Sequence, residues 1–199
     1  MKKIILYIHG KGGNHLEAEQ YKDVCPDFDV IGLDYEDYFP WVIESKFNKV
    51  YDDLQKSYEN IYIIANSIGA YFTMHSLKNR KIEKALFISP ILDMEKLILD
   101  MLTWANTTEE QLYQKGEIHT NFGETLSWEY LTFVRNNPIN WNIRTEILYG
   151  ENDNLTSIQT VETFVKKHDS SLTVLKDGEH WFHTDKQMNF LYNWVKKVI

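Results

Sequence analysis

Four polar segments of this sequence each follow directly after a short apolar run, and together they contain the residue types of a nucleophilic site. The segments are HGKGG at 9–13, Ser67, END at 151–153 and DGEH at 177–180. A serine hydroxyl becomes an effective nucleophile when a histidine takes its proton and a carboxylate orients that histidine. A serine, a carboxylate and a histidine in these segments therefore indicate acyl-transfer chemistry with Ser67 as the nucleophile.

These segments must be positioned by the apolar runs that precede them. Six runs rich in Ile, Leu, Val, Phe and Tyr occupy residues 2–8, 28–33, 61–66, 84–89, 145–150 and 171–176. Most are continuous rather than alternating, which is typical of strands covered on both faces. Helical patterns lie at 14–21, 41–58, 67–79, 157–168 and 185–199. This alternation predicts an α/β fold with a doubly wound, mostly parallel six-stranded sheet.

The predicted topology brings the polar segments together. In an open α/β sheet, ligands bind beyond the carboxyl ends of the strands, and each polar segment follows such an end. Ser67 also precedes a helical pattern, so an ordinary helix N-cap is the alternative interpretation of this serine. The three other segments at matching strand ends favour the nucleophile.

One interval breaks the strand–helix rhythm. Between Pro90 and Thr145 the sequence shows no convincing strand, but it contains three helix-like segments at 94–105, 107–116 and 125–137. These predict a helical, lid-like insert over about 91–140. The length of 199 residues and the absence of a linker predict a single domain spanning 1–199.

Composition restricts the partners and the compartment. The formal net charge of −8 disfavours nucleic acid and anionic membranes as partners, because both need a concentrated positive face. Cys25 is the only cysteine, so neither an internal disulfide nor a cysteine-based zinc site is expected, which fits the cytoplasm. The apolar run at 2–8 is too short for a secretion signal, and no later run approaches the ~18 residues of a membrane span. We therefore expect a cytoplasmic protein.

With these motifs the sequence resembles the α/β-hydrolase superfamily, in a small form that lacks the first two strands of that fold. The chain order serine, aspartate, histidine is the one used by that superfamily. Its G-x-S-x-G elbow corresponds here to Ala65-Asn66-Ser67-Ile68-Gly69, with alanine in place of the first glycine. The resemblance implies a serine hydrolase, esterase-like, that acts on a small acyl substrate without a cofactor. A non-catalytic binding protein that retains the same fold is the alternative.

The acid and the base follow from the same resemblance. Asp153 matches the G-x-x-D position of the superfamily's acid, and Glu151 is its nearest rival. Two histidines follow the last predicted strand, but Thr184 and Gln187 form a capping box that places His183 at the entry to the final helix. His180 lies in the preceding loop and is therefore expected to be the base. A metal-binding role for the two histidines is not favoured, since no third ligand lies nearby.

The loop at 9–13 resembles the superfamily's H-G-x oxyanion loop. By that match, the backbone N–H groups of Lys11 and Ile68 hold the negatively charged oxygen of the tetrahedral intermediate. His9 itself is expected to be structural. A phosphate-binding loop is not favoured, because neither GxxxxGK[ST] nor GxGxxG is present.

Overall fold

The computed structural model describes residues 2–199 and divides into two compact units. The first unit comprises Met1–Leu92 and Asn140–Ile199, and the second comprises Asp93–Ile139. The second unit lies within the interval of about 91–140 in which the sequence analysis expects a lid-like insert.

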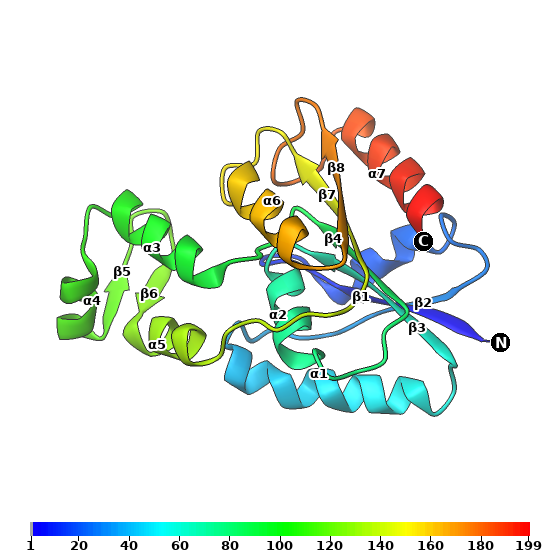
Figure 1. Cartoon of the computed structure of the whole chain (residues 1–199), viewed down its shortest axis with the longest axis horizontal. Helices are drawn as coiled ribbons and strands as arrows, with labels where there is room; N and C mark the ends of the chain where they lie inside the picture. Colours follow the sequence, from blue (N-terminus) through cyan, green and yellow to red (C-terminus); the bar gives the residue numbers. More distant parts are fainter. Residues whose placement is uncertain (1) are drawn as a thin grey trace. The chain divides into compact units, whose positions relative to one another are not determined.

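The first unit is built on a parallel six-stranded sheet, as the sequence predicts (Figure 1). Its strands are β1 (Lys3–Ile8), β2 (Asp29–Gly32), β3 (Asn60–Asn66), β4 (Lys84–Ile88), β7 (Thr145–Gly150) and β8 (Ser170–Leu175). They lie in the order β2-β1-β3-β4-β7-β8, and every neighbouring pair is parallel. The chain therefore starts near the middle of the sheet and winds outward in both directions, which confirms the doubly wound α/β prediction.

Five helices of this unit lie at the predicted places. They are η1 (His15–Tyr21), α1 (Pro40–Gln55), α2 (Ile68–Ser76), α6 (Ile158–Lys167) and α7 (Asp185–Val198). Asn14 with Glu17 and Thr184 with Gln187 form capping boxes at the starts of η1 and α7. These reciprocal bonds satisfy backbone N–H groups that a helix leaves without partners, so both entry points are fixed by sequence. The first helix is a 3-10 helix.

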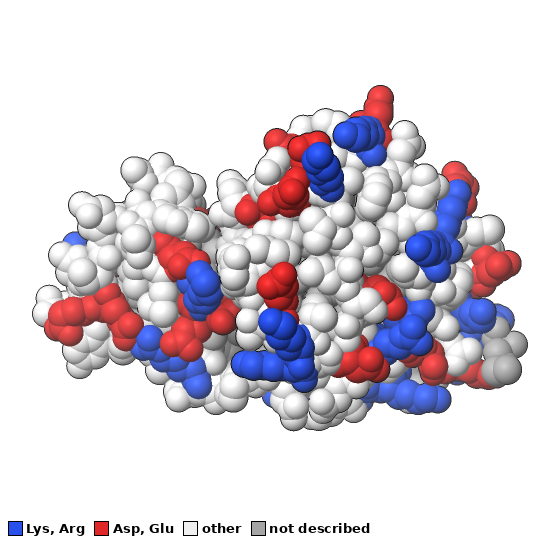
Figure 2. Space-filling model, turned by 45° about the horizontal axis from the view of Figure 1, so that its top comes forward, with Lys and Arg blue, Asp and Glu red and all other residues white. Residues whose placement is uncertain are grey.

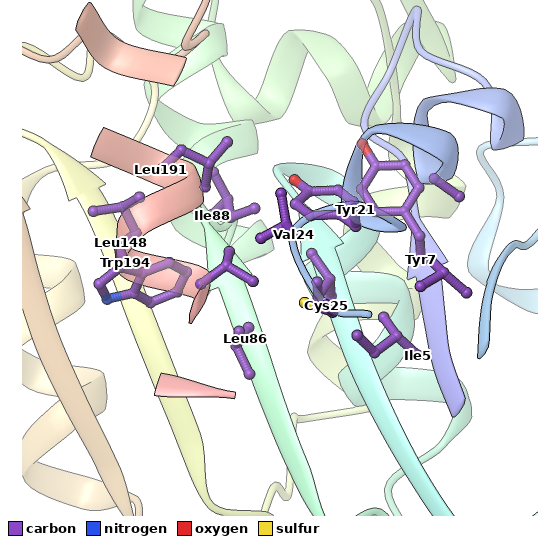
Figure 3. Packing of buried hydrophobic residues seen from close by; sticks show 14 of the residues in the cluster. Ile5, Tyr7, Tyr21, Val24, Cys25, Leu86, Ile88, Leu148, Leu191 and Trp194 are labelled. Carbon is purple, nitrogen blue, oxygen red and sulfur yellow. The ribbon is translucent and has the colours of Figure 1, made fainter. Parts of the chain in front are cut away.

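Alternation along the strands sends side chains to two faces of the sheet. On one face, Tyr7 of β1 packs in a cluster with Tyr21 of η1 and with Leu191 and Trp194 of α7 (Figure 3). On the other face, the side chain of Ile8 lies against Gly69 of α2. The cluster includes Leu86, Ile88 and Leu148 from β4 and β7, so η1 and α7 cover several strands at once.

The second unit contains a small antiparallel sheet that the sequence analysis did not predict. Its elements are α3 (Met94–Trp104), α4 (Glu109–Lys115), β5 (Glu117–His119), β6 (Thr125–Ser127) and α5 (Trp128–Asn136). The expectation of no strand in this interval was wrong. The strands escaped the sequence analysis because each is only three residues long, and Ile118 and Leu126 are the only large apolar residues of the small sheet. Arg135 of α5 joins the helices by ion pairs with Glu95 and Glu109, at 2.7 and 2.5 Å.

Charged side chains of both signs are interspersed on the face shown in Figure 2, and no continuous basic patch is visible there. Within residues 2–199, no helix is both long enough and apolar enough to cross a membrane.

The core cluster gives a stability prediction. Leu148 is fully buried in β7, and truncation to alanine leaves a cavity between the sheet and α7. We expect Leu148→Ala to lower the free energy of unfolding by about 2–5 kcal/mol in urea titrations followed by circular dichroism. Val174→Ala is the control, because Val174 in neighbouring β8 is 44% exposed and its loss should change stability little. Equal effects of the two substitutions would contradict this assignment of the core.

Candidate active site

Ser67 lies at a sharp turn between β3 and α2. Its backbone has φ 53° and ψ −121°, a left-handed conformation that is unusual for a residue with a side chain. The Ser67 N–H donates to the carbonyl of Ile88 at the end of β4, and the Ser67 carbonyl accepts from the N–H of Ile91. The Ser67 side chain makes no capping hydrogen bond to α2, so the interpretation as an ordinary helix cap is not supported.

Two glycines make room for this turn. A Cβ atom on Gly69 would lie 2.6 Å from the carbonyl oxygen of His9, which is closer than real Cβ contacts come. A Cβ atom on Gly10 would lie 3.1 Å from Cβ of Ser67. The backbone of the loop after β1 therefore approaches the turn directly, and at position 69 only glycine permits that approach without a shift of the backbone. Ala65, which stands where the elbow motif has its first glycine, is fully buried without conflict.

The structure brings three predicted side chains into one hydrogen-bonded array. Ser67 Oγ lies 2.8 Å from His180 Nε2, and His180 Nδ1 lies 2.7 Å from Asp153 Oδ2. The other oxygen of Asp153, Oδ1, accepts from the backbone N–H groups of Leu155 and Thr156 at 2.8 and 3.0 Å. The Asp153 side chain is fully buried, whereas the histidine remains 14% exposed. When Nδ1 carries the proton and donates a hydrogen bond to the carboxylate, Nε2 has a lone pair that can accept the serine proton.

Close contact between two loops holds the acid and the histidine together. A Cβ atom on Gly150 would lie 2.4 Å from the carbonyl oxygen of Glu179, so the loops after β7 and β8 touch through their backbones. The N–H of Asn152 donates to the carbonyl of Gly178 at 2.7 Å. Glu151, the predicted rival of Asp153, instead accepts from the N–H of Asp177 at 3.0 Å. Glu151 therefore fixes the loop rather than the imidazole.

His183 has different partners from His180. Its Nδ1 lies 2.9 Å from the carbonyl oxygen of Trp181 and 3.4 Å from the Glu179 carboxylate. Its ring stacks on Trp181 with centroids 4.7 Å apart, and the side chain is 41% exposed. Its own N–H donates to Gln187, which belongs to the capping box of α7. His183 is thus held at the helix entry, outside the array.

The loop at 9–13 lies beside the serine. His9 is buried, its Nδ1 and Nε2 lie 2.8 and 3.2 Å from the carbonyl oxygens of Gly10 and Tyr35, and its ring stacks on Tyr35. Lys11 follows Gly10, which contacts the serine turn. Ile68 is the first residue of α2, where backbone N–H groups have no acceptor within the helix and favour an anion.

A cavity of about 370 Å³ opens next to this loop. It is lined by residues 10–13, by Asn66, which precedes the serine, by residues of η1 and α7, and by Trp181 and Phe182 after the histidine. Apart from the loop at 9–13 and Asn66 of the elbow motif, the sequence analysis did not single out these lining residues. Glu17 belongs to the capping box of η1, and a capping pattern does not reveal which way its carboxylate points.

Within the described residues 2–199, no group of three or more His, Cys, Asp or Glu side chains could hold a metal ion.

Comparison with known proteins identifies the fold. No protein-family model matches the sequence, and no curated protein matches it. Among solved structures, Est1E from Butyrivibrio proteoclasticus superposes with a TM-score of 0.80 at 16% identity, over 98% of this chain and 86% of that one. The α/β-hydrolase domain-containing protein 10 from mouse gives 0.79 at 14% identity, over 98% and 88%. An esterase from Pyrococcus furiosus gives 0.59 at 17% identity, over 99% and 80%. The chain therefore has the α/β-hydrolase fold.

The close packing at the turn generates a prediction. Gly69→Ala adds one methyl group against the backbone carbonyl of His9, so we expect it to lower the free energy of unfolding by about 1–3 kcal/mol and to displace the turn. Urea titration measures the stability, and loss of the Ser67 conformation should be visible in a crystal structure of the variant. Leu77→Ala, at the far end of α2, is a control for generic damage to the helix, which should leave the turn in place. An unchanged turn in Gly69→Ala would contradict the argument.

Proposed function

We propose that this protein is a serine hydrolase that cleaves an ester or related acyl bond with Ser67 as nucleophile, His180 as base and Asp153 as orienting acid. The observation that carries the proposal is the continuous hydrogen-bonded path from the Ser67 hydroxyl through both ring nitrogens of His180 to a buried carboxylate. A serine used only for packing or capping does not need a base, and a base used only for packing does not need a buried acid.

The geometry suits a two-step reaction. His180 Nε2 accepts the serine proton while Ser67 Oγ attacks the carbonyl carbon, and the Asp153 carboxylate stabilises the imidazolium that forms. Collapse of the tetrahedral intermediate breaks the bond to the leaving group, which takes the proton from His180. A water molecule then attacks the acyl-enzyme and gives up a proton to His180. Collapse of this second intermediate breaks the bond to Ser67 Oγ, which takes the proton back from His180 as the acid is released.

The N–H groups of Lys11 and Ile68 are the proposed donors to the negatively charged oxygen. The support is their position, because Lys11 follows the glycine that packs on Ser67 and Ile68 begins α2. Losing one such donor typically costs about 3 kcal/mol of transition-state stabilisation. Both donors are backbone groups, so the chain conformation rather than side-chain identity preserves them.

Ester hydrolysis is the reaction favoured among those that this arrangement can catalyse. Several structural neighbours are esterases, and one structure of Est1E contains ferulic acid. The fold supports many activities, so the neighbours suggest the bond type and leave the substrate of this chain to be determined. Thioester, amide and carbon–carbon bond cleavage use the same groups.

Covalent labelling tests the nucleophile. We expect a fluorophosphonate probe to label the protein stoichiometrically at Ser67, because His180 activates that hydroxyl, and we expect Ser67→Ala to remain unlabelled with an unchanged circular dichroism spectrum. Mass spectrometry of the labelled peptide identifies the site. Ser89→Ala is the matched control, since Ser89 is also a positive-φ serine after a strand but has no histidine partner within residues 2–199. Stoichiometric labelling of Ser67→Ala would refute Ser67 as the nucleophile, and absence of labelling of the wild type would favour a non-catalytic role.

The two histidines give a second, sharper test. His180→Ala removes the base and should lower kcat on an activated aryl ester by several orders of magnitude, since the members of such an array act as a unit. His183→Ala should change kcat little, because His183 contacts Trp181 and Glu179 at the entry to α7. Asp153→Asn should be impaired in the same direction as His180→Ala but less severely. An inactive His183→Ala beside an active His180→Ala would overturn the base assignment while leaving the fold intact.

A further inference from the structure

The cavity beside the loop at 9–13 is close enough to Ser67 to hold part of a substrate. Gly10 lines it and also packs on Ser67, while Asn66 precedes the serine and Trp181 follows His180. Its volume of about 370 Å³ falls within the range of small-molecule pockets. The cavity therefore shares the backbone of Gly10 with the Ser67 turn and can hold a substituent of a molecule bound there.

A carboxylate lines this pocket. Glu17 Oε2 accepts from the Tyr7 hydroxyl at 2.6 Å, and Glu17 Oε1 accepts from the backbone N–H of Asn14 at 3.3 Å. A Cβ atom on Gly13 would lie 2.7 Å from Oε1, so the glycine allows the carboxylate to lie against the loop. Each oxygen has a further lone pair that can accept another hydrogen bond.

Tyr7 holds this carboxylate as a neutral donor. Burial, the neighbouring Tyr21 and the hydrogen bond to Glu17 together raise the pKa of the Tyr7 hydroxyl well above its ordinary value. The phenol therefore stays protonated, and its hydroxyl donates a hydrogen bond to Glu17 without supplying positive charge.

No ion pair joins this carboxylate to a cation within the part of the chain that the structure describes. Among residues 2–199, no Lys, Arg or His approaches Glu17 within ion-pair distance, whereas Glu19 on the same helix pairs with Lys22 at 2.7 Å. The other charged residue in the lining is Lys11, and its ammonium lies 5.9 Å from the centroid of the Tyr38 ring, which is not part of the lining. A half-buried carboxylate without a cation is a strong attractor for a positively charged ligand.

The remaining lining suits the same kind of ligand. The rings of Tyr21, which is almost fully buried, and of Trp181, which is 70% exposed, belong to the lining, and aromatic rings attract cations through their electron-rich faces. The net charge of −8 also favours the approach of a cation from solution. A neutral aliphatic group would gain contact with the rings but would leave the carboxylate without a charged partner.

We propose that this pocket binds an ammonium group of the substrate, with Glu17 as the residue that selects it. The protein is then a hydrolase for esters whose acyl or alcohol part carries a protonated amine. This inference rests on the proposed function, because the pocket acts as a specificity site only if Ser67 is the nucleophile.

Matched substrates test the preference. One pair places the charge on the acyl side, the para-nitrophenyl esters of ε-aminocaproic and heptanoic acid, and the other places it on the alcohol side, dimethylaminoethyl butyrate and isopentyl butyrate. Within each pair an ammonium nitrogen replaces a carbon, so shape is nearly constant. We expect kcat/KM to favour the charged member of one pair by at least about tenfold, the size of a charge-assisted contact. No preference in either pair would overturn the proposal.

Three variants assign the preference to this pocket. Glu17→Gln keeps the capping residue type of η1 and should bring the ratio to about one, while Glu19→Gln removes the same charge from the same helix and should leave it unchanged. Gln20→Lys should also abolish the preference, since residue 20 lines the pocket and lysine supplies the missing cation with Glu17 intact. A ratio that survives both Glu17→Gln and Gln20→Lys would refute the assignment.

Binding without turnover separates this proposal from the proposed function. Calorimetry with protonated aminopentanol and its uncharged isostere hexanol should show tighter binding of the amine to wild type and to Ser67→Ala, and no difference in Glu17→Gln. Equal binding of the two probes to wild type would refute the ammonium site even if esters are hydrolysed. Absence of both fluorophosphonate labelling and ester turnover would refute the hydrolase even if the amine binds.

Discussion

The left-handed backbone of Ser67 is the constraint on which the rest of the site depends. A residue with a side chain in this conformation costs on the order of 1–3 kcal/mol, so the surrounding structure must impose it. The backbone hydrogen bonds of Ser67 with Ile88 of β4 and with Ile91 in the segment after β4 hold the turn in this conformation. The turn also depends on Gly10 in the loop after β1 and on Gly69 in α2, because the backbone packs so closely at these two positions that a side chain would crowd the neighbouring atoms. The turn lifts the hydroxyl off the edge of the sheet, where a base from another strand can reach it.

The parallel sheet supplies the other half of the arrangement. Because β3, β7 and β8 run in the same direction, their carboxyl ends deliver the serine, the acid and the histidine to one edge. Burying the Asp153 carboxylate would be unfavourable by itself, and two backbone N–H groups and His180 together satisfy it. The contact of Gly150 with the backbone of the loop after β8 helps to hold Asp153 and His180 within hydrogen-bond distance.

The sequence was informative wherever local chemistry determines the outcome. The six strands follow from continuous apolar runs, and the entry to α7 follows from its capping box. The Ser67–His180–Asp153 contacts agree with the order of the polar segments, since the parallel topology leaves one edge for them to meet. Two features lay beyond this reasoning. The hairpin β5–β6 is too short to produce a periodic signal, and the pocket depends on where η1 and α7 meet the loop at 9–13, which is a matter of tertiary packing.

Two carboxylates near the serine show how environment separates their roles. Asp153 is fully buried and accepts from three donors, one of them the imidazole, so its charge is committed to the histidine and unavailable to a ligand. Glu17 accepts from a phenol and one backbone N–H, lines a cavity and has no cationic partner among residues 2–199. Under the two proposals, the same functional group orients the imidazole in one place and recognises a cation in the other. The difference arises from the number of donors that the fold brings to each carboxylate.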